Sequence, residues 1–178
     1  IPSNVEDGIN YTSDNSVVLV LDAPHKDFVY VSGSFNNWEP DESYIMKKDP
    51  NSSKFWLVVD NLDSDIDHTY QYWVVDLEPL ENSPELVKTA DPYSHLVLSP
   101  FDDPWIPENS YPNLPTYPEG QEREVTLFNL SLNDYNWQVE NFEKPKKEDL
   151  IIYEVLIRDF DSERTFQNLI DKIDYFKN

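Results

Sequence analysis

The chain has 178 residues, of which 39% are hydrophobic, and a formal net charge of −22 at pH 7; this length suits one domain, or one domain with a fragment of another. The negative charge argues against nucleic acid and anionic membranes as partners, because both attract patches of Lys and Arg. The absence of cysteine excludes disulfides, zinc–thiolate sites and thiol catalysis, and no apolar run approaches the length of about 18 residues that suggests a membrane span.

The first forty residues contain two predicted strands. Residues 1–15 are polar and read as a lead-in, and because the chain opens at Ile1 without an initiator Met, we expect a trimmed chain or a mature form. Residues 17–21 form a continuous apolar run, which predicts a strand covered on both faces. Residues 28–31 are aromatic or β-branched and predict a second strand. Gly33 should end it, at a position where a Cβ atom would clash.

The residues after this second strand predict a turn with aromatic anchors. Phe35 is the first anchor, and Asn36 and Asn37 are turn formers. Trp38 adds a large ring with a polar N–H. A structural interpretation is a strand, a turn and an aromatic plug beneath it; a functional interpretation makes the ring a binding surface.

Further short strands are predicted at residues 44–47, 55–59, 69–75 and 95–98, with turn signals between them. These six segments, with no helical periodicity before residue 100, approach the roughly seven short strands typical of a β-sandwich. Within 69–75 the side chains alternate between two faces. Tyr70, Tyr72 and Val74 share one face, and Gln71, Trp73 and Val75 share the other.

The acidic segment 60–68 resembles the first half of a calcium loop through Asp63, Asp65 and Asp67. A calcium loop that starts at Asp63 needs Gly at position 68 and Glu at position 74. The sequence has His68 and Val74 instead. We therefore expect a solvated turn and assign no metal ligand.

Residues 99–122 contain six prolines, a density that forbids both a helix interior and a central strand. An extended linker is predicted, laid along a surface by aromatic anchors. The anchors expected here are Trp105, Tyr111 and Tyr117, with further ones at Tyr135, Trp137 and Phe142. Residues 125–128 are read as an isolated strand.

The last thirty residues predict one β/α unit. Residues 150–157 are the longest apolar run of the second half and indicate a buried, parallel-type strand. Residues 165–176 have an apolar stripe at spacings of three and four, which indicates an amphipathic helix, with Thr165 as its N-cap. One such unit cannot cover its own strand, so we expect it to be part of a larger domain.

Three motifs carry a resemblance to known families. Val-Tyr-Val-Ser-Gly-Ser-Phe-Asn-Asn-Trp at residues 29–38 resembles the signature of immunoglobulin-like α-glucan-binding modules (carbohydrate-binding module family 48, E-set). These modules precede the barrel of glycogen-branching and debranching enzymes, and a related one occurs in the AMP-activated kinase β subunit. Residues 90–94 are similar to the element that closes the sandwich in branching enzymes. Residues 152–160 look like the first barrel strand of the α-amylase family (glycoside hydrolase family 13).

The resemblance covers nearly the whole chain and implies a mainly β architecture in three parts. It implies an immunoglobulin-like β-sandwich over 1–100, an extended Pro-rich linker over 101–149, and the first strand and helix of a truncated (β/α)8 barrel over 150–178. The implied function is that of an N-terminal accessory module of a secreted, periplasmic or cell-surface α-glucan-active enzyme. Its implied partners are an α-glucan and the remainder of its own barrel.

In the family the catalytic carboxylates lie on later barrel strands, beyond Asn178, so no catalytic residue and no cofactor are assigned, and Asp159 is interpreted as structural. For sugar contact the resemblance points to Trp38, which matches the family's stacking Trp, and to Asn36 beside it. Trp73 stands where the kinase module has a sugar-contacting Lys, and Lys88 stands where that module has its second stacking Trp. Two alternatives remain, a stand-alone glycogen- or starch-binding module and a structural immunoglobulin-like domain without sugar binding.

Overall fold

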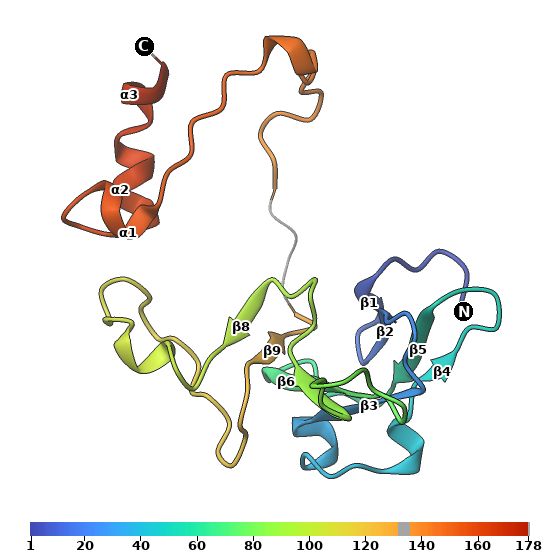
Figure 1. Ribbon diagram of the computed structural model, residues 1–178. Helices are drawn as coiled ribbons and strands as arrows, with labels where there is room; N and C mark the ends of the chain where they lie inside the picture. The colour runs from blue at the N-terminus through green and yellow to red at the C-terminus, as the bar shows by residue number, and fades with distance from the viewer. Residues whose placement is uncertain (132–135, 178) are drawn as a thin grey trace. The chain divides into compact units, whose positions relative to one another are not determined.

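The computed structural model describes residues 1–131 and 136–177, so the predicted anchor Tyr135 lies outside the described residues. The chain divides into two compact units. The first comprises Ile1–Pro104 and Thr116–Leu132, and the second comprises Trp105–Pro115 and Asn133–Asn178. The first unit contains two antiparallel sheets, drawn mostly in blue and green in Figure 1, which agrees with the predicted β-sandwich.

The first sheet has the strand order β1-β2-β5-β4. Its strands are β1 (Gly8–Ser13), β2 (Ser16–Asp22), β4 (Lys47–Lys48) and β5 (Lys54–Val59). Six of the seven residues of β2 are buried, which confirms the strand covered on both faces. The predicted lead-in over 1–15 is wrong, because β1 lies within it. The short strand predicted at 44–47 is replaced by a 3₁₀ turn, Glu42–Tyr44, followed by β4.

The second sheet is built around β6 (His68–Val75). Its order is β3-β6-β9-β8, and β7 also pairs with β6. The other strands are β3 (Phe28–Gly33), β7 (Leu86–Thr89), β8 (Leu96–Leu98) and β9 (Val125–Phe128). Because β3 occupies one edge of β6, both β7 and β9 share the opposite edge. There β9 pairs with the first three residues of β6, and β7 pairs with the last four.

The strand β9 corrects two expectations about the middle of the chain. Residues 125–128 are not an isolated strand, because β9 lies between β6 and β8 and all four of its residues are buried. The sandwich therefore does not end near residue 100, since a strand from the predicted linker completes its second sheet. The anchor Tyr117 donates its hydroxyl hydrogen to the carbonyl oxygen of Arg123, just before β9, at 2.5 Å. Trp105, by contrast, is 83% exposed and anchors nothing.

The core lies between the two sheets. The predicted alternation of β6 is confirmed, because Tyr70 and Tyr72 are fully buried on the core face and Val74 packs against the same cluster. The side chains that fill the core come from β2, β3, β5 and β6. Fully buried ones among them include Leu19, Val29, Val31, Phe55, Tyr70 and Tyr72.

A buried carboxylate closes the sandwich from the segment 90–94. The hydroxyl groups of Tyr70 and Tyr72 each donate to Oδ2 of Asp91 at 2.8 Å. The backbone N–H of Tyr93 donates to the other carboxylate oxygen at 2.8 Å, and the N–H of Asp91 donates to Thr126 of β9. Burial raises the pKa of both tyrosine hydroxyls well above their usual value.

The second unit contains three short helices, α1 (Ile157–Phe160), α2 (Phe166–Asp171) and α3 (Ile173–Lys177). Thr165 is the N-cap of α2, as predicted, and accepts a hydrogen bond from the backbone N–H of Asn168 at 3.1 Å. The single helix predicted over 165–176 is interrupted at Lys172, which has φ −104° and ψ 12°. None of the helices in the described residues is long and apolar enough to cross a membrane.

The buried strand predicted at residues 150–157 is wrong for this structure. No strand is formed there, and Ile151 and Ile152 are 98% and 83% exposed. A strand needs a neighbouring backbone to complete its hydrogen bonds, and an apolar run alone does not supply one. Leu150 and Leu156, near the two ends of the segment, nevertheless have extended dihedral angles.

Candidate functional site

The turn that follows β3 holds the first pair of predicted sugar-contact residues. A 3₁₀ turn, Ser34–Asn36, leads from Gly33 towards Trp38. Oδ1 of Asn36 accepts a hydrogen bond from the N–H of Gly33 at 2.8 Å, and its Nδ2 donates to the carbonyl of Val31 at 3.0 Å. The N–H of Trp38 donates to the carbonyl of Gly33 at 2.9 Å. Both ends of the Asn36 amide are therefore engaged in closing the turn.

Gly33 is required here by distance, which confirms the predicted clash. A Cβ atom at this position would lie 2.5 Å from the carbonyl oxygen of Thr69 and 2.9 Å from the ring of Phe35. The φ of Gly33 is −163°, an extended conformation open to any residue, so conformational freedom is not the reason. Phe35 in turn stacks on Tyr44, with ring centroids 5.6 Å apart. This packing fixes the position of the turn.

Trp38 has an unusual backbone conformation for its size. Its φ is 62°, and that of Asn37 is 52°, so two consecutive residues lie in the left-handed region. Asn adopts this region readily, whereas for a bulky residue it is an outlier that costs on the order of 1–3 kcal/mol. The side chain of Trp38 is half-buried. Strain of this kind concentrates at ligand-contacting segments, which makes the turn a candidate binding element.

The second pair of predicted residues meets on the outer face of the second sheet. Tyr30 of β3 pairs in register with Trp73 of β6, which pairs in register with Lys88 of β7. The ammonium nitrogen of Lys88 lies 4.4 Å from the centre of the Trp73 ring, within the range of a cation–π interaction. The same nitrogen is 3.5 Å from Oε2 of Glu122. Lys88 is thus held between an aromatic ring and a carboxylate.

Gln71 fills the position where β6 changes partner from β9 to β7. Its Nε2 donates to the carbonyl oxygens of Arg123 and Glu124, both at 3.0 Å, and its Oε1 accepts from Nε1 of Trp73 at 3.4 Å. Gln71 is fully buried and lies opposite Ser32 of β3. The hydroxyl of Ser32 is also buried and has no hydrogen-bond partner among the described residues. Gln71 therefore links the Trp73 ring to the backbone of Arg123 and Glu124.

An open cleft of about 450 Å³ runs beside these residues. It is lined by all four residues of β7, by Pro84, and by residues 122–124. Its walls are mixed, with apolar Leu86 and Val87 next to charged Lys88 and Glu122. Five of the eight lining residues are polar or charged, so the cleft offers hydrogen-bonding groups beside a small apolar patch.

The structure thus brings together two of the predicted residues and ties two others to one turn. Trp73 and Lys88 are in contact, whereas Asn36 and Trp38 belong to the turn after β3. Sequence reasoning missed Glu122, for which a proline-rich segment offers no signal. It also passed over Tyr30, although alternation along 28–33 could have placed this ring on the face of Trp73.

The described residues contain no group of three or more His, Asp or Glu side chains able to hold a metal ion. In the acidic segment, Asp63 accepts from the N–H of Asp65 at 2.9 Å, and Asp67 accepts from Asn129 at 3.0 Å. His68 is buried, with Nε2 2.8 Å from the carbonyl oxygen of Asp63. The Asp63 carboxylate therefore serves local turn geometry, whereas the Asp67 carboxylate links this segment to the residue after β9.

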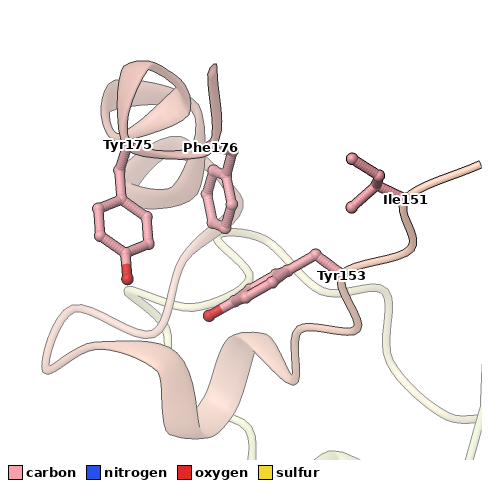
Figure 2. A pocket seen from close by; sticks show the side chains of 4 residues that line it. All are labelled: Ile151, Tyr153, Tyr175 and Phe176. Atoms are coloured by element: carbon pink, nitrogen blue, oxygen red, sulfur yellow. The ribbon is translucent and has the colours of Figure 1, made fainter. Parts of the chain in front are cut away.

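A separate apolar hollow lies in the second unit, and Figure 2 shows the side chains that line it. They are Ile151, Tyr153, Tyr175 and Phe176. The rings of Tyr153 and Phe176 meet edge to face, with centroids 5.2 Å apart. Among the described residues, no carboxylate lines this hollow. The nearby Asp159 is hydrogen-bonded to Arg158 at 3.0 Å, which lowers the pKa of its carboxyl group.

Comparison with known proteins gives short, local likenesses, and no family model matches the chain. Over 44 residues the chain is 50% identical to malto-oligosyltrehalose trehalohydrolase from Saccharolobus solfataricus, a stretch of 25% of this chain and 8% of that protein. Among solved structures it is similar to ligand-free PulA from Klebsiella pneumoniae, with a TM-score of 0.41, 24% identity, and coverage of 53% of this chain and 9% of that one.

A second solved structure similar to the chain is a mutant pullulanase from Paenibacillus barengoltzii complexed with maltotriose. Here the TM-score is 0.38 and the identity is 20%, over 52% of this chain and 13% of that one. The trehalohydrolase is a curated relative, and the chain spans 8% of its length.

Proposed function

We propose that the first unit is an immunoglobulin-like accessory module that contacts α-glucan chains of the starch or glycogen type. The observation that carries this proposal is Trp38, a large ring held in a strained left-handed conformation by a turn whose hydrogen bonds are complete. An aromatic ring can stack on the apolar face of a glucose unit while polar neighbours take the hydroxyl groups. The local 50% identity to a trehalohydrolase supports the same class of carbohydrate.

In this proposal Trp38 is the principal stacking ring. Asn36 acts through the turn, because both ends of its amide already hold backbone groups. Trp73 marks a second contact region on the outer face of the sheet, where Lys88 lies against its ring. The module itself carries no catalytic residue.

Residues 150–178 are, in the same proposal, the start of a (β/α)8 barrel of the α-amylase type, and the parent enzyme hydrolyses or transfers glycosidic bonds. This is supported by the exposed apolar side chains of residues 150–156, which retain an extended conformation at both ends. Further barrel strands would cover them. A secreted, periplasmic or cell-surface location belongs to the proposal and is supported by the sequence resemblance and the acidic composition.

Affinity electrophoresis in native gels that contain soluble starch tests the binding role. We expect the wild-type chain to be retarded relative to a starch-free gel, and Trp38→Ala to lose most of that retardation. A loss of about tenfold in affinity corresponds to about 1.4 kcal/mol. Trp105→Ala is the matched control, because this ring is 83% exposed and lies outside the turn. Equal retardation of the wild type and Trp38→Ala would refute the stacking role.

A further inference from the structure

The outer-face ring of Trp73 is occupied in this structure. The Lys88 ammonium lies 4.4 Å from the ring centre, in the position that a stacked ligand would take on that face. A cation and a sugar ring cannot occupy the same face of one indole at the same time. While Lys88 is in this position, no ligand can stack on this face of Trp73.

The position of Lys88 depends on a segment from elsewhere in the chain. Glu122 lies 3.5 Å from the Lys88 nitrogen, and it is itself largely exposed, at 74% for its side chain. The backbone beside Glu122 is attached to the sheet by Gln71, which donates to the carbonyl oxygens of the two following residues. Tyr117 adds a hydrogen bond to Arg123. The carboxylate that holds Lys88 is thus presented by a docked segment.

We propose that Lys88 is a removable cap on Trp73, and that a neutral glucan gains a second stacking contact when the cap moves away. This inference rests on the proposed α-glucan binding and adds a control element to it. Glu122 is exposed, so water and salt screen its 3.5 Å contact with the partly buried Lys88, and this contact can be displaced without disturbing the sandwich. When Lys88 moves, the hydrogen bonds from Gln71 to the carbonyl oxygens of Arg123 and Glu124 keep residues 122–124 attached to the sheet.

The first sheet provides a matched control for this cap. Lys47 of β4 pairs in register with Trp56 of β5, and its ammonium lies 4.7 Å from the centre of that ring. The geometry is the same as that of Lys88 and Trp73, but the pair lies on the other sheet. Removing Lys47 therefore controls for the general effect of losing one positive charge and one cation–π contact.

The test is isothermal titration of maltoheptaose into the full chain. We expect Lys88→Ser to bind about fivefold more tightly than the wild type, and Lys88→Ser combined with Trp73→Leu to lose that gain. Lys47→Ser should match the wild type. Tighter binding by Lys88→Ser supports the cap even if the wild type itself shows no binding. Equal or weaker binding by Lys88→Ser, or no binding by either, overturns it.

A second measurement needs no ligand and is independent of glucan binding. A Lys side chain above an indole ring has its ε-methylene protons shifted upfield by the ring current, and NMR detects this shift directly. We expect the shift for Lys88, its loss in Trp73→Leu, and its reduction in Glu122→Gln. An unshifted Lys88 in the wild type would overturn the cap, whereas failure of starch retardation by Trp38 would count only against the proposed function.

Discussion

The buried carboxylate of Asp91 offers the sharpest test of how the sandwich is closed. In Asp91→Ala the hydroxyl groups of Tyr70 and Tyr72 both lose their acceptor inside the core. An unsatisfied buried polar group costs about 1–3 kcal/mol, so the two together cost about 4 kcal/mol. Asp91→Asn keeps an acceptor oxygen but removes the charge, and we expect it to cost about 2 kcal/mol.

Urea unfolding followed by tryptophan fluorescence measures these changes. With a slope of about 2 kcal/mol per M of urea, Asp91→Ala should lower the midpoint by about 2 M. Asp49→Ala is the control, because Asp49 also accepts two hydrogen bonds, from Ser52 and from the N–H of Asn51, but within an exposed turn. It should cost less than about 1 kcal/mol. Equal midpoints for Asp91→Ala and Asp49→Ala would refute the buried-carboxylate account.

Two further predictions concern the same unit. Gly33→Ala should lower the free energy of unfolding, measured with urea, by about 2 kcal/mol, because the backbone oxygen of Thr69 cannot move away from the new methyl group. Gly120→Ala is the control, since no atom lies within 4 Å of the added Cβ. It should show only the smaller cost of a φ of 80°. The raised pKa values of Tyr70 and Tyr72 mean that stability is fully present below pH 10 and is lost as the pH rises above it, because the unfolded tyrosines ionise first. The free energy of unfolding, measured with urea, should change little between pH 9 and 10 and should fall above pH 10, with a contribution that approaches about 1.4 kcal/mol per pH unit from each tyrosine. Tyr72→Phe should remove one such contribution, and an unchanged slope would contradict this linkage.

The strands with strong apolar patterns were predictable from the sequence. Segments such as 17–21, 55–59 and 69–75 match β2, β5 and β6, because a face packed on the core selects large apolar residues at regular spacing. The strands β1 and β7 were missed. They have few buried residues, so burial left little pattern in them.

The pairing of strands was less predictable than their existence. Residues 125–128 were expected to be a strand, but only the tertiary structure supplies β6 and β8 as neighbours. Residues 150–157 show the converse, since an apolar run that predicts a buried strand remains unpaired and exposed when no neighbouring strand is present. Pairing depends on residues distant in the chain, which local patterns do not encode.

The candidate site divides in the same way. Trp38 and Asn36 are close in sequence, so a local motif was enough to place them in one turn. The contact between Trp73 and Lys88 depends on the register of β6 with β7 across a loop of ten residues, and Glu122 comes from a segment without periodicity. Neither feature has a local signal.

The shared edge of β6 has a consequence for the dynamics of the sheet. Because β6 bonds to β3 along one edge and to β9 and β7 in tandem along the other, release of β7 would leave β6 held on both sides. Strand β7 can therefore open as a separate unit at a fraction of the global unfolding free energy. Its amide hydrogens should exchange with solvent long before those of β6. Since β7 carries Lys88, each such opening would also uncover Trp73, in addition to any movement of the Lys88 side chain that leaves β7 in place.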